Sequence, residues 1–332
     1  MHKQLLFSLV TMLSLVSCGV DSKHFKMEGR ILNMNQGEFY VYDDQGFISG
    51  IDTIKIEGGR FVYEMECERP TTVMLVFPNF SEQPIFAESH ESVTIKGDAS
   101  HLKVLSVKGT KTNERMTEFR QQISNASPPE IKKHASQLIE DHPESPIAPY
   151  LLKKYFVNTA KPDFKEASRL AKIIMEKQSG NLRLARQSQM IENLNKAKVG
   201  SPLPTFTAYD LRGRLVSSSD LSNGLAVICA WASWSYESTA QLRSIQRIQK
   251  KSKGRLKAMS ISVDASRKDC KDVIDRDSIA WPNVCDGKLF ESKTLLQLGM
   301  TSIPDNILIK NGKIIARGLS TKDLEDTIEK NL

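Results

Sequence analysis

Two serines separated by two residues, Ser235 and Ser238, are the residues whose types and spacing most directly suggest chemistry. They follow the apolar run 225–229 and precede a helix-like segment, 239–250, so they lie at a strand-to-helix turn. A serine there can be a nucleophile when a neighbouring base takes its proton. It can equally cap the helix through its hydroxyl oxygen, which contributes about 1 kcal/mol.

The nucleophile interpretation requires a base. All six histidines precede the segment that contains the turn, so the base would have to come from another domain or be Glu237, close to Ser235 in sequence. We therefore favour the capping role for Ser235. The histidines are His2, His24, His90, His101, His134 and His142.

Five cysteines offer a second kind of chemistry. Cys67 and Cys229 fall on apolar strand patterns, which is typical of inert core residues. Cys270 lies in the first turn of a predicted helix, and Cys285 ends the next predicted strand near the same edge, an arrangement that permits a disulfide. The pair would be a structural clip or, as a functional hypothesis, an alternative thiol couple.

The first residues predict export and lipid attachment. Lys3 gives a positive start, the apolar run 5–15 is too short to span a bilayer, and Leu15-Val16-Ser17-Cys18 resembles a lipobox. We expect a lipoprotein signal peptide over residues 1–17. Ordinary secretory cleavage nearby is the alternative.

Cleavage before Cys18 would leave that cysteine carrying acyl chains such as palmitate, on a lipidated tether over residues 18–23. The membrane would then be a partner through the lipid on Cys18. We expect a cell-envelope protein that faces the periplasm rather than the cell surface, because residues 19–23 carry no clear acidic export cluster.

The run Ala230-Trp231-Ala232-Ser233-Trp234 followed by Ser235-Tyr236-Glu237-Ser238 resembles the active-site turn of TlpA-type thioredoxin-like oxidoreductases of the bacterial envelope. In that family W-A-S-W precedes Cys-x-x-Cys. Thiol–disulfide exchange requires a thiolate and a mixed disulfide, which serine cannot supply. The resemblance therefore implies the fold with a degenerate site and no catalytic residue.

Later segments fit the order of elements in that fold. The Asn311-Gly312 pair between two apolar runs predicts a hairpin, and helices alternating with strands predict a mostly parallel sheet. The expected strands are 256–264, 281–285, 306–309 and 313–317, and the expected helices are 267–277, 289–298 and 321–331.

Ile303 and Pro304 match the family's cis-proline loop, which faces the active-site turn and offers backbone groups to an extended substrate. Alternatively, Pro304 only shapes the loop before a strand. Asp305 stands where the family usually has threonine or serine. The implied binding surface comprises Trp234, Ser235, Tyr236, Glu237, Ser238, Ile303 and Pro304.

Upstream of this region the sequence predicts two further parts. Short strands rich in β-branched and aromatic residues predict a small β-sandwich over 24–107, similar to a domain of unassigned function found ahead of thioredoxin modules. Residues 108–198 predict helices, with prolines at the breaks. The expected fold is multidomain: a β-sandwich, a helical region and an α/β thioredoxin-like domain over 199–332.

Composition bounds the function. The chain has 332 residues, 40% of them hydrophobic, and a net charge of +7, which is mild for this size. The basic pairs Lys132-Lys133 and Lys153-Lys154 lack aromatic interleaving, which argues against nucleic-acid binding. No zinc-ligand spacing or phosphate-binding loop predicts a metal or nucleotide cofactor.

These observations favour a lipid-anchored module that binds a peptide, a protein or an envelope component at the thioredoxin-like groove, with a redox-inactive site. The alternative is a thiol-disulfide oxidoreductase that uses Cys270 and Cys285. A purely architectural role, in which the chain spaces other components, is the third interpretation.

Overall fold

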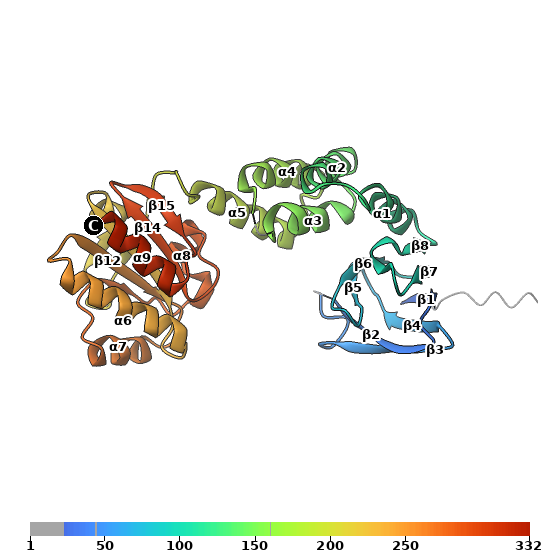
Figure 1. Ribbon diagram of the computed structural model, residues 1–332, viewed down its shortest axis with the longest axis horizontal. Helices are drawn as coiled ribbons and strands as arrows, with labels where there is room; N and C mark the ends of the chain where they lie inside the picture. Colours follow the sequence, from blue (N-terminus) through green and yellow to red (C-terminus); the bar gives the residue numbers. More distant parts are fainter. Residues whose placement is uncertain (1–22, 44, 160) are drawn as a thin grey trace, which may run out of the picture. The chain divides into compact units, whose positions relative to one another are not determined.

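The computed structural model describes residues 23–43, 45–159 and 161–332 (Figure 1). The predicted signal peptide and Cys18 lie outside these residues. The chain divides into two compact units, of which the first comprises the described residues up to His134 together with Ser145–Ile147. The second contains Ala135–Glu144 and Ala148–Leu332. No helix within the described ranges is long and apolar enough to cross a membrane.

The N-terminal β domain predicted from the sequence is present as one continuous eight-stranded sheet. Its order is β6-β5-β2-β3-β4-β1-β7-β8, and every pairing is antiparallel except the parallel pairing of β1 with β7. The strands are β1 (His24–Leu32), β2 (Gln36–Asp43), β3 (Asp52–Glu57), β4 (Arg60–Glu66), β5 (Thr71–Val76), β6 (Glu82–Ala87), β7 (Ser92–Asp98) and β8 (Ser106–Lys108).

One hydrophobic core takes side chains from all eight strands, so the sheet wraps around it. Phe39 is central to this core, because it packs edge-to-face on Phe61 and Phe77 with ring centroids 5.7 and 5.0 Å away. Buried residues alternate with more exposed ones along β3, β5 and β7, since only one face of the sheet turns inward.

Side chains of helix α1 (Lys111–Gln122) hydrogen-bond to the backbone of both edge strands of this sheet, β6 and β8. Asn113 exchanges hydrogen bonds with the backbone of Phe86 in β6, at 2.8 and 3.0 Å. Thr117 does the same with the backbone of Val107 in β8, at 2.9 and 3.0 Å. Backbone groups at an open sheet edge need partners, and α1 supplies them through side chains.

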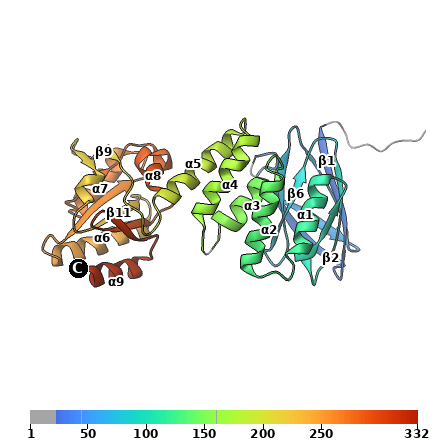
Figure 2. The ribbon, with the colours of Figure 1, turned by 90° about the horizontal axis from the view of Figure 1, so that it is seen from above.

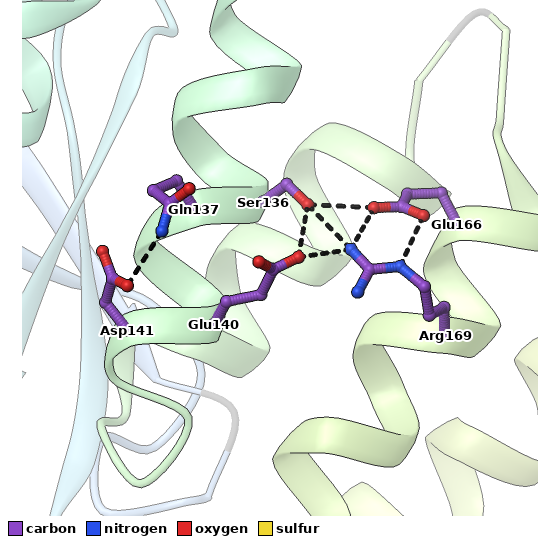
Figure 3. Close-up of polar contacts among 6 residues, drawn as sticks. All are labelled: Ser136, Gln137, Glu140, Asp141, Glu166 and Arg169. Atoms are coloured by element: carbon purple, nitrogen blue, oxygen red, sulfur yellow. Dashed lines mark hydrogen bonds and ion pairs between the residues drawn. The ribbon is translucent and has the colours of Figure 1, made fainter.

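The predicted helical region contains α2 (Pro128–Asp141), α3 (Ile147–Leu152), a π-helical turn (Lys153–Val157), α4 (Phe164–Lys177) and α5 (Leu182–Lys196). Helices α4 and α5 pack against each other (Figure 2). A polar cluster joins α2 to α4, with Arg169 placed between Glu140 and Glu166 (Figure 3).

The C-terminal sheet has the order β13-β12-β11-β14-β15. It is mixed, so the prediction of a mostly parallel sheet was wrong: β11, β12 and β13 run parallel, whereas β14 and β15 pair antiparallel. The Asn311-Gly312 turn explains part of this, because a tight hairpin forces β15 to reverse direction after β14. The strands are β11 (Leu225–Trp231), β12 (Leu256–Ser262), β13 (Asn283–Val284), β14 (Asp305–Lys310) and β15 (Lys313–Arg317).

Helices cover both faces of this sheet (Figure 1). Helices α6 (Tyr236–Lys251), α7 (Arg267–Arg276) and α9 (Thr321–Asn331) contribute to one core cluster, and α8 (Lys293–Leu298) contributes to the other. The predicted helix 289–298 is divided, since Leu289–Glu291 is a 3-10 turn and Ser292 has an extended ψ of 124°. A two-stranded hairpin, β9 (Thr207–Tyr209) and β10 (Leu215–Ser217), precedes the sheet.

Candidate functional site

Ser235 caps the N-terminus of α6, as the sequence predicted. Its backbone is extended, and its hydroxyl oxygen accepts the N–H of Ser238 at 3.3 Å. The Ser235 carbonyl in turn accepts the Thr239 N–H at 3.1 Å. A serine in this role satisfies one of the backbone donors that every helix start leaves without an intrahelical partner.

Ser238 is enclosed by the turn. Its hydroxyl oxygen accepts the Ala232 N–H at 3.1 Å and lies 3.2 Å from the Ala232 carbonyl and 3.0 Å from the Ser235 carbonyl. The side chain is 1% exposed. The second serine of the motif therefore braces the backbone from within, and is not presented to a substrate.

Three side chains of the same turn point into solvent instead. Trp234 is 69% exposed and Tyr236 is 80% exposed, while Glu237 is also exposed. Exposed tryptophan and tyrosine are the side chains most often found as anchors of protein interfaces. The turn thus displays two aromatic rings and a carboxylate around a pair of hydroxyl groups that are engaged with the backbone.

The loop with Ile303 and Pro304 lies beside the turn. The peptide bond between them is cis, as the resemblance implied. Strand β14 pairs with β11 so that Asp305 faces Ala230, which places Ile303 and Pro304 next to the residues that follow β11. Ile303 packs in the same hydrophobic cluster as Ala232. The structure therefore brings together the two segments of the predicted surface.

Asp264, which sequence reasoning did not select, anchors the start of the turn. Its carboxylate accepts the Ser233 N–H at 3.0 Å and the Ser233 hydroxyl at 2.8 Å. It also accepts the Ser262 hydroxyl at 2.7 Å and is 2% exposed. The sequence contains one signal that could have identified Asp264, which is its position directly after β12. Strand β12 runs parallel to β11, and neighbouring parallel strands end at the same edge of a sheet.

Cys270 and Cys285 lie next to this network as free, buried thiols. The interaction between the two thiols lowers the pKa of Cys285 to about 6 and raises the pKa of Cys270 above its usual range. A smaller contribution from the Ser262 hydroxyl lowers the pKa of both thiols. The Sγ of Cys285 lies 3.7 Å from the Asp264 carbonyl oxygen. The disulfide between them stays a prediction.

Cys67 and Cys229 are buried, as expected of core residues. Burial raises the pKa of both thiols, which disfavours the reactive thiolate.

Asp305, directly after Pro304, is a buried carboxyl group with 7% exposure. Burial raises its pKa, although the charge of Arg317 opposes this effect. The Arg317 guanidinium donates to the carbonyls of Ala197 and Gly299, both at 2.8 Å. Arg317 therefore fastens the end of the helical region and the loop after α8 to β15.

A groove of about 530 Å³ lies elsewhere in this domain, along residues 256–259 of β12 and the β10 strand. These residues form the N-terminal half of β12, so the groove is at the other end of the sheet from the turn. Among the described residues, no group of three or more His, Cys, Asp or Glu side chains is placed to hold a metal ion.

Two family profiles match parts of the chain. Residues 25–116 match a domain of unknown function, DUF4369. Residues 199–317 match the AhpC/TSA family. No curated protein is significantly similar to the chain.

Several solved structures are similar to the C-terminal part. A C-terminal domain assigned to a thiol-disulfide oxidoreductase from Bacteroides thetaiotaomicron is 30% identical, with 41% of this chain and 97% of that chain covered and a TM-score of 0.38. A thiol-disulfide oxidoreductase from Bacteroides fragilis is 27% identical, with 40% and 100% covered and a TM-score of 0.37.

The order of elements around β11 and the AhpC/TSA match identify the C-terminal part as a thioredoxin-like domain. The chain is a thioredoxin-like protein that carries an additional N-terminal domain.

Proposed function

We propose that this protein is a binding module whose thioredoxin-like turn recognises an extended peptide segment without redox chemistry. The observation that carries the proposal is the engagement of both serine hydroxyls with the turn backbone, while Trp234 and Tyr236 are exposed beside them. Serine oxygens stand where the resembled family has reactive sulfur atoms, and the exposed aromatic side chains around them are present.

The chemistry of serine excludes ordinary exchange at this turn. Disulfide exchange needs a thiolate that attacks sulfur and then forms a mixed disulfide. Ser235 accepts a backbone N–H as a helix cap, and Ser238 is 1% exposed, so neither group replaces that function. Ser235 and Ser238 instead stabilise the conformation of the turn by hydrogen bonds to its backbone.

The binding surface would have two walls. Trp234 and Tyr236 supply apolar area that a partner can cover, and burying one such ring contributes about 2 kcal/mol. Ile303 and Pro304 supply the second wall, where backbone groups can pair with an extended chain. Glu237 adds a negative charge, which favours partners with a basic residue next to their apolar anchor.

We also propose that the protein is held at the cell envelope by lipid on Cys18, with its domains in the periplasm. The sequence Leu15-Val16-Ser17-Cys18 after a short apolar run supports this proposal. Metabolic labelling with a palmitate analogue tests it: label should be lost in Cys18→Ser, and label retained in that variant would refute lipidation there.

A second candidate function is thiol-disulfide exchange by Cys270 and Cys285. The lowered pKa of Cys285, about 6, favours it, because the thiolate is the attacking species. The exposures of 0% for Cys270 and 1% for Cys285 oppose it, since a protein substrate must reach one sulfur to form a mixed disulfide.

A disulfide-reduction assay separates these functions. We expect no turnover by the natural chain and measurable turnover by a Ser235→Cys/Ser238→Cys variant, which restores two thiols at the turn. Turnover by the natural chain that disappears in Cys285→Ser would instead establish the second function.

Binding is tested by selection of peptides from a displayed library on the natural chain. Retention of the selected peptide should fall about thirty-fold in Trp234→Ala or Tyr236→Ala, which corresponds to about 2 kcal/mol. Tyr209→Ala is the matched control, because Tyr209 is 66% exposed but lies on the β9 hairpin. Equal retention by all three variants would refute the proposed surface.

A further inference from the structure

We propose that the groove between β10 and the N-terminal half of β12 binds an extended acidic segment of a partner protein, which adds to the sheet as one more strand. The groove has a volume of about 530 Å³ and lies at the opposite end of the sheet from the turn at 235–238. This inference goes beyond the proposed function, because it assigns a second binding site built from other residues.

The first step is the edge of β12 that the sheet leaves open. Strand β13 pairs with β12 at Ser260 and Ile261. Pro282, directly before β13, accepts the Ser260 N–H at 3.0 Å but has no N–H of its own to donate, so the pairing stops there. Within the described ranges, residues 256–259 therefore pair with a strand only on the β11 side.

Backbone groups on this edge point into the groove. In a strand, the N–H and C=O of one residue lie on the same side, and successive residues alternate between the two sides. Because the Ser260 N–H points away from β11, the backbone groups of Ala258 point the same way, and Ala258 lines the groove. An open strand edge is a template on which another extended chain can pair.

The opposite wall of the groove supplies an apolar contact. The β9–β10 hairpin is fastened to β13, since the Leu211 N–H donates to the Asn283 carbonyl at 2.7 Å. A β-bridge between Asp210 and Val284 adds to this connection. Leu215 of β10 lines the groove and is 62% exposed, so an apolar side chain of a bound segment can cover it.

The charge around the groove favours a negative partner. Segment 238–263 contains seven basic residues and no acidic one. Its three arginines are engaged by carboxylates or by backbone carbonyls. Its four lysines are exposed, and no carboxylate in the described part of the chain pairs with them. They are Lys250, Lys251, Lys253 and Lys257.

Two of these lysines lie at the groove itself. Lys257 lines it and donates to the Asp220 carbonyl at 2.9 Å, while Lys253 adjoins the lining residue Gly254. The Asp220 carboxylate is engaged, because it accepts the Ser217 N–H at 2.7 Å as a cap. The groove therefore keeps an excess of positive charge, which attracts and orients glutamate or aspartate side chains of a partner.

These features together select a peptide among anionic partners. Residues 256–259 span about 13 Å at roughly 3.3 Å per residue, so about four residues of an extended chain can pair along them. Charge alone would suit an acidic lipid surface or polysaccharide equally well. Only a peptide also matches a backbone edge that lies inside a groove, with an apolar side chain on the facing wall.

The test uses a fluorescent peptide of alternating valine and glutamate as the probe, with the full chain. Fluorescence anisotropy measures its binding, and hydrogen exchange locates it. We expect saturable binding that weakens as salt is raised, and slower exchange over residues 256–259. The same peptide with every amide N-methylated keeps its charge but cannot donate to the edge, so it should bind about ten-fold more weakly.

Two exposed positions allow variants of the protein that should still fold, which thermal melting checks. Lys253→Glu/Lys257→Glu should weaken binding of the peptide about ten-fold, and Leu215→Ser about five-fold. Lys293→Glu is the matched control, because Lys293 is an exposed lysine at the start of α8. Unchanged binding in both groove variants would refute the site. Equal binding of the N-methylated peptide would refute strand addition.

The remaining arms separate other partners and the other site. Vesicles of phosphatidylglycerol and the polysaccharide polygalacturonate are tested as anionic probes without an amide backbone. Tighter binding of either one than of the peptide, lost in Lys253→Glu/Lys257→Glu, would overturn a peptide as the occupant. Slower exchange over residues 232–239 in place of 256–259 would put the peptide at the turn, and would overturn the second site while leaving the proposed function intact.

Discussion

The Ser238 hydroxyl and the Ala232 backbone hold each other across the turn, with the Ala232 N–H donating at 3.1 Å and the Ala232 carbonyl 3.2 Å away. The same hydroxyl is 3.0 Å from the Ser235 carbonyl. A cysteine there would offer a weak donor and a weak acceptor. Ser238 therefore stabilises the turn through hydrogen bonds that a cysteine would make only weakly.

Removing this hydroxyl should destabilise the fold. We expect Ser238→Ala to lower the free energy of unfolding by about 2 kcal/mol, because the buried Ala232 N–H is left without its partner. Urea denaturation measures the difference. Ser266→Ala is the matched control, since Ser266 caps α7 through one hydrogen bond of 3.2 Å and should cost only about 1 kcal/mol. Equal losses would contradict a special role for Ser238.

Asn113 should matter in the same way for the N-terminal sheet. Its amide exchanges two hydrogen bonds with Phe86 in the edge strand β6 and is fully buried. We expect Asn113→Ala to lower the free energy of unfolding by about 2 kcal/mol, since two buried hydrogen bonds to the backbone are lost. Gln122→Ala, at an exposed site of the same helix, should change it by less than about 0.5 kcal/mol. Similar melting temperatures for the two variants would mean that water replaces the two hydrogen bonds that Asn113 makes to Phe86.

Asp305→Asn should stabilise the protein at neutral pH. Burial raises the pKa of Asp305, so the folded state disfavours its ionised form, and stability falls as the pH rises from the unfolded pKa through the folded one. The variant should therefore match the natural chain near pH 3 and exceed it near pH 7 in urea midpoint. A less stable variant at pH 7 would mean that attraction to Arg317 outweighs the cost of burial.

Local patterns in the sequence predicted most of the fold. The helix at 321–331 and the strand at 313–317 have the predicted bounds, because a serine cap and a tight Asn-Gly turn mark them within a few residues. Helix α6 begins three residues before the predicted start, since Ser235 caps it earlier. The order of strands in the N-terminal sheet was not predicted, because β1 pairs with β4 and β7, which are distant from it in sequence.

The site was predicted in part. Ser235 and Ser238 were found by spacing, but Asp264 and Ser262 were not, since their roles arise from where two parallel strands end. The antiparallel β14 was also missed, because a helix before a strand does not fix its direction. Predicting contacts between the ends of strands requires the order of strands in the sheet, and no local sequence pattern gives that order.

Arg169 should stabilise the α2–α4 contact in a pH-dependent way. Its guanidinium bonds Glu166 at 2.6 and 2.8 Å, contacts Glu140, and donates to the Ser136 hydroxyl at 3.2 Å (Figure 3). The hydrogen bond from Arg169 lowers the pKa of Glu166 below its usual 4.5. The stabilisation is therefore present above pH 4.5 and is lost as the pH falls through the lowered value.

We expect Arg169→Gln to lower the free energy of unfolding by about 1 kcal/mol at pH 7, since the cluster is partly exposed. The loss should shrink at acid pH, as the pH falls through the lowered pKa of Glu166 in the natural chain. Urea midpoints at both pH values measure it, with Lys268→Gln as the control for an exposed pair within one helix. A loss that is the same at both pH values would assign the effect to packing of the Arg169 stem rather than to charge.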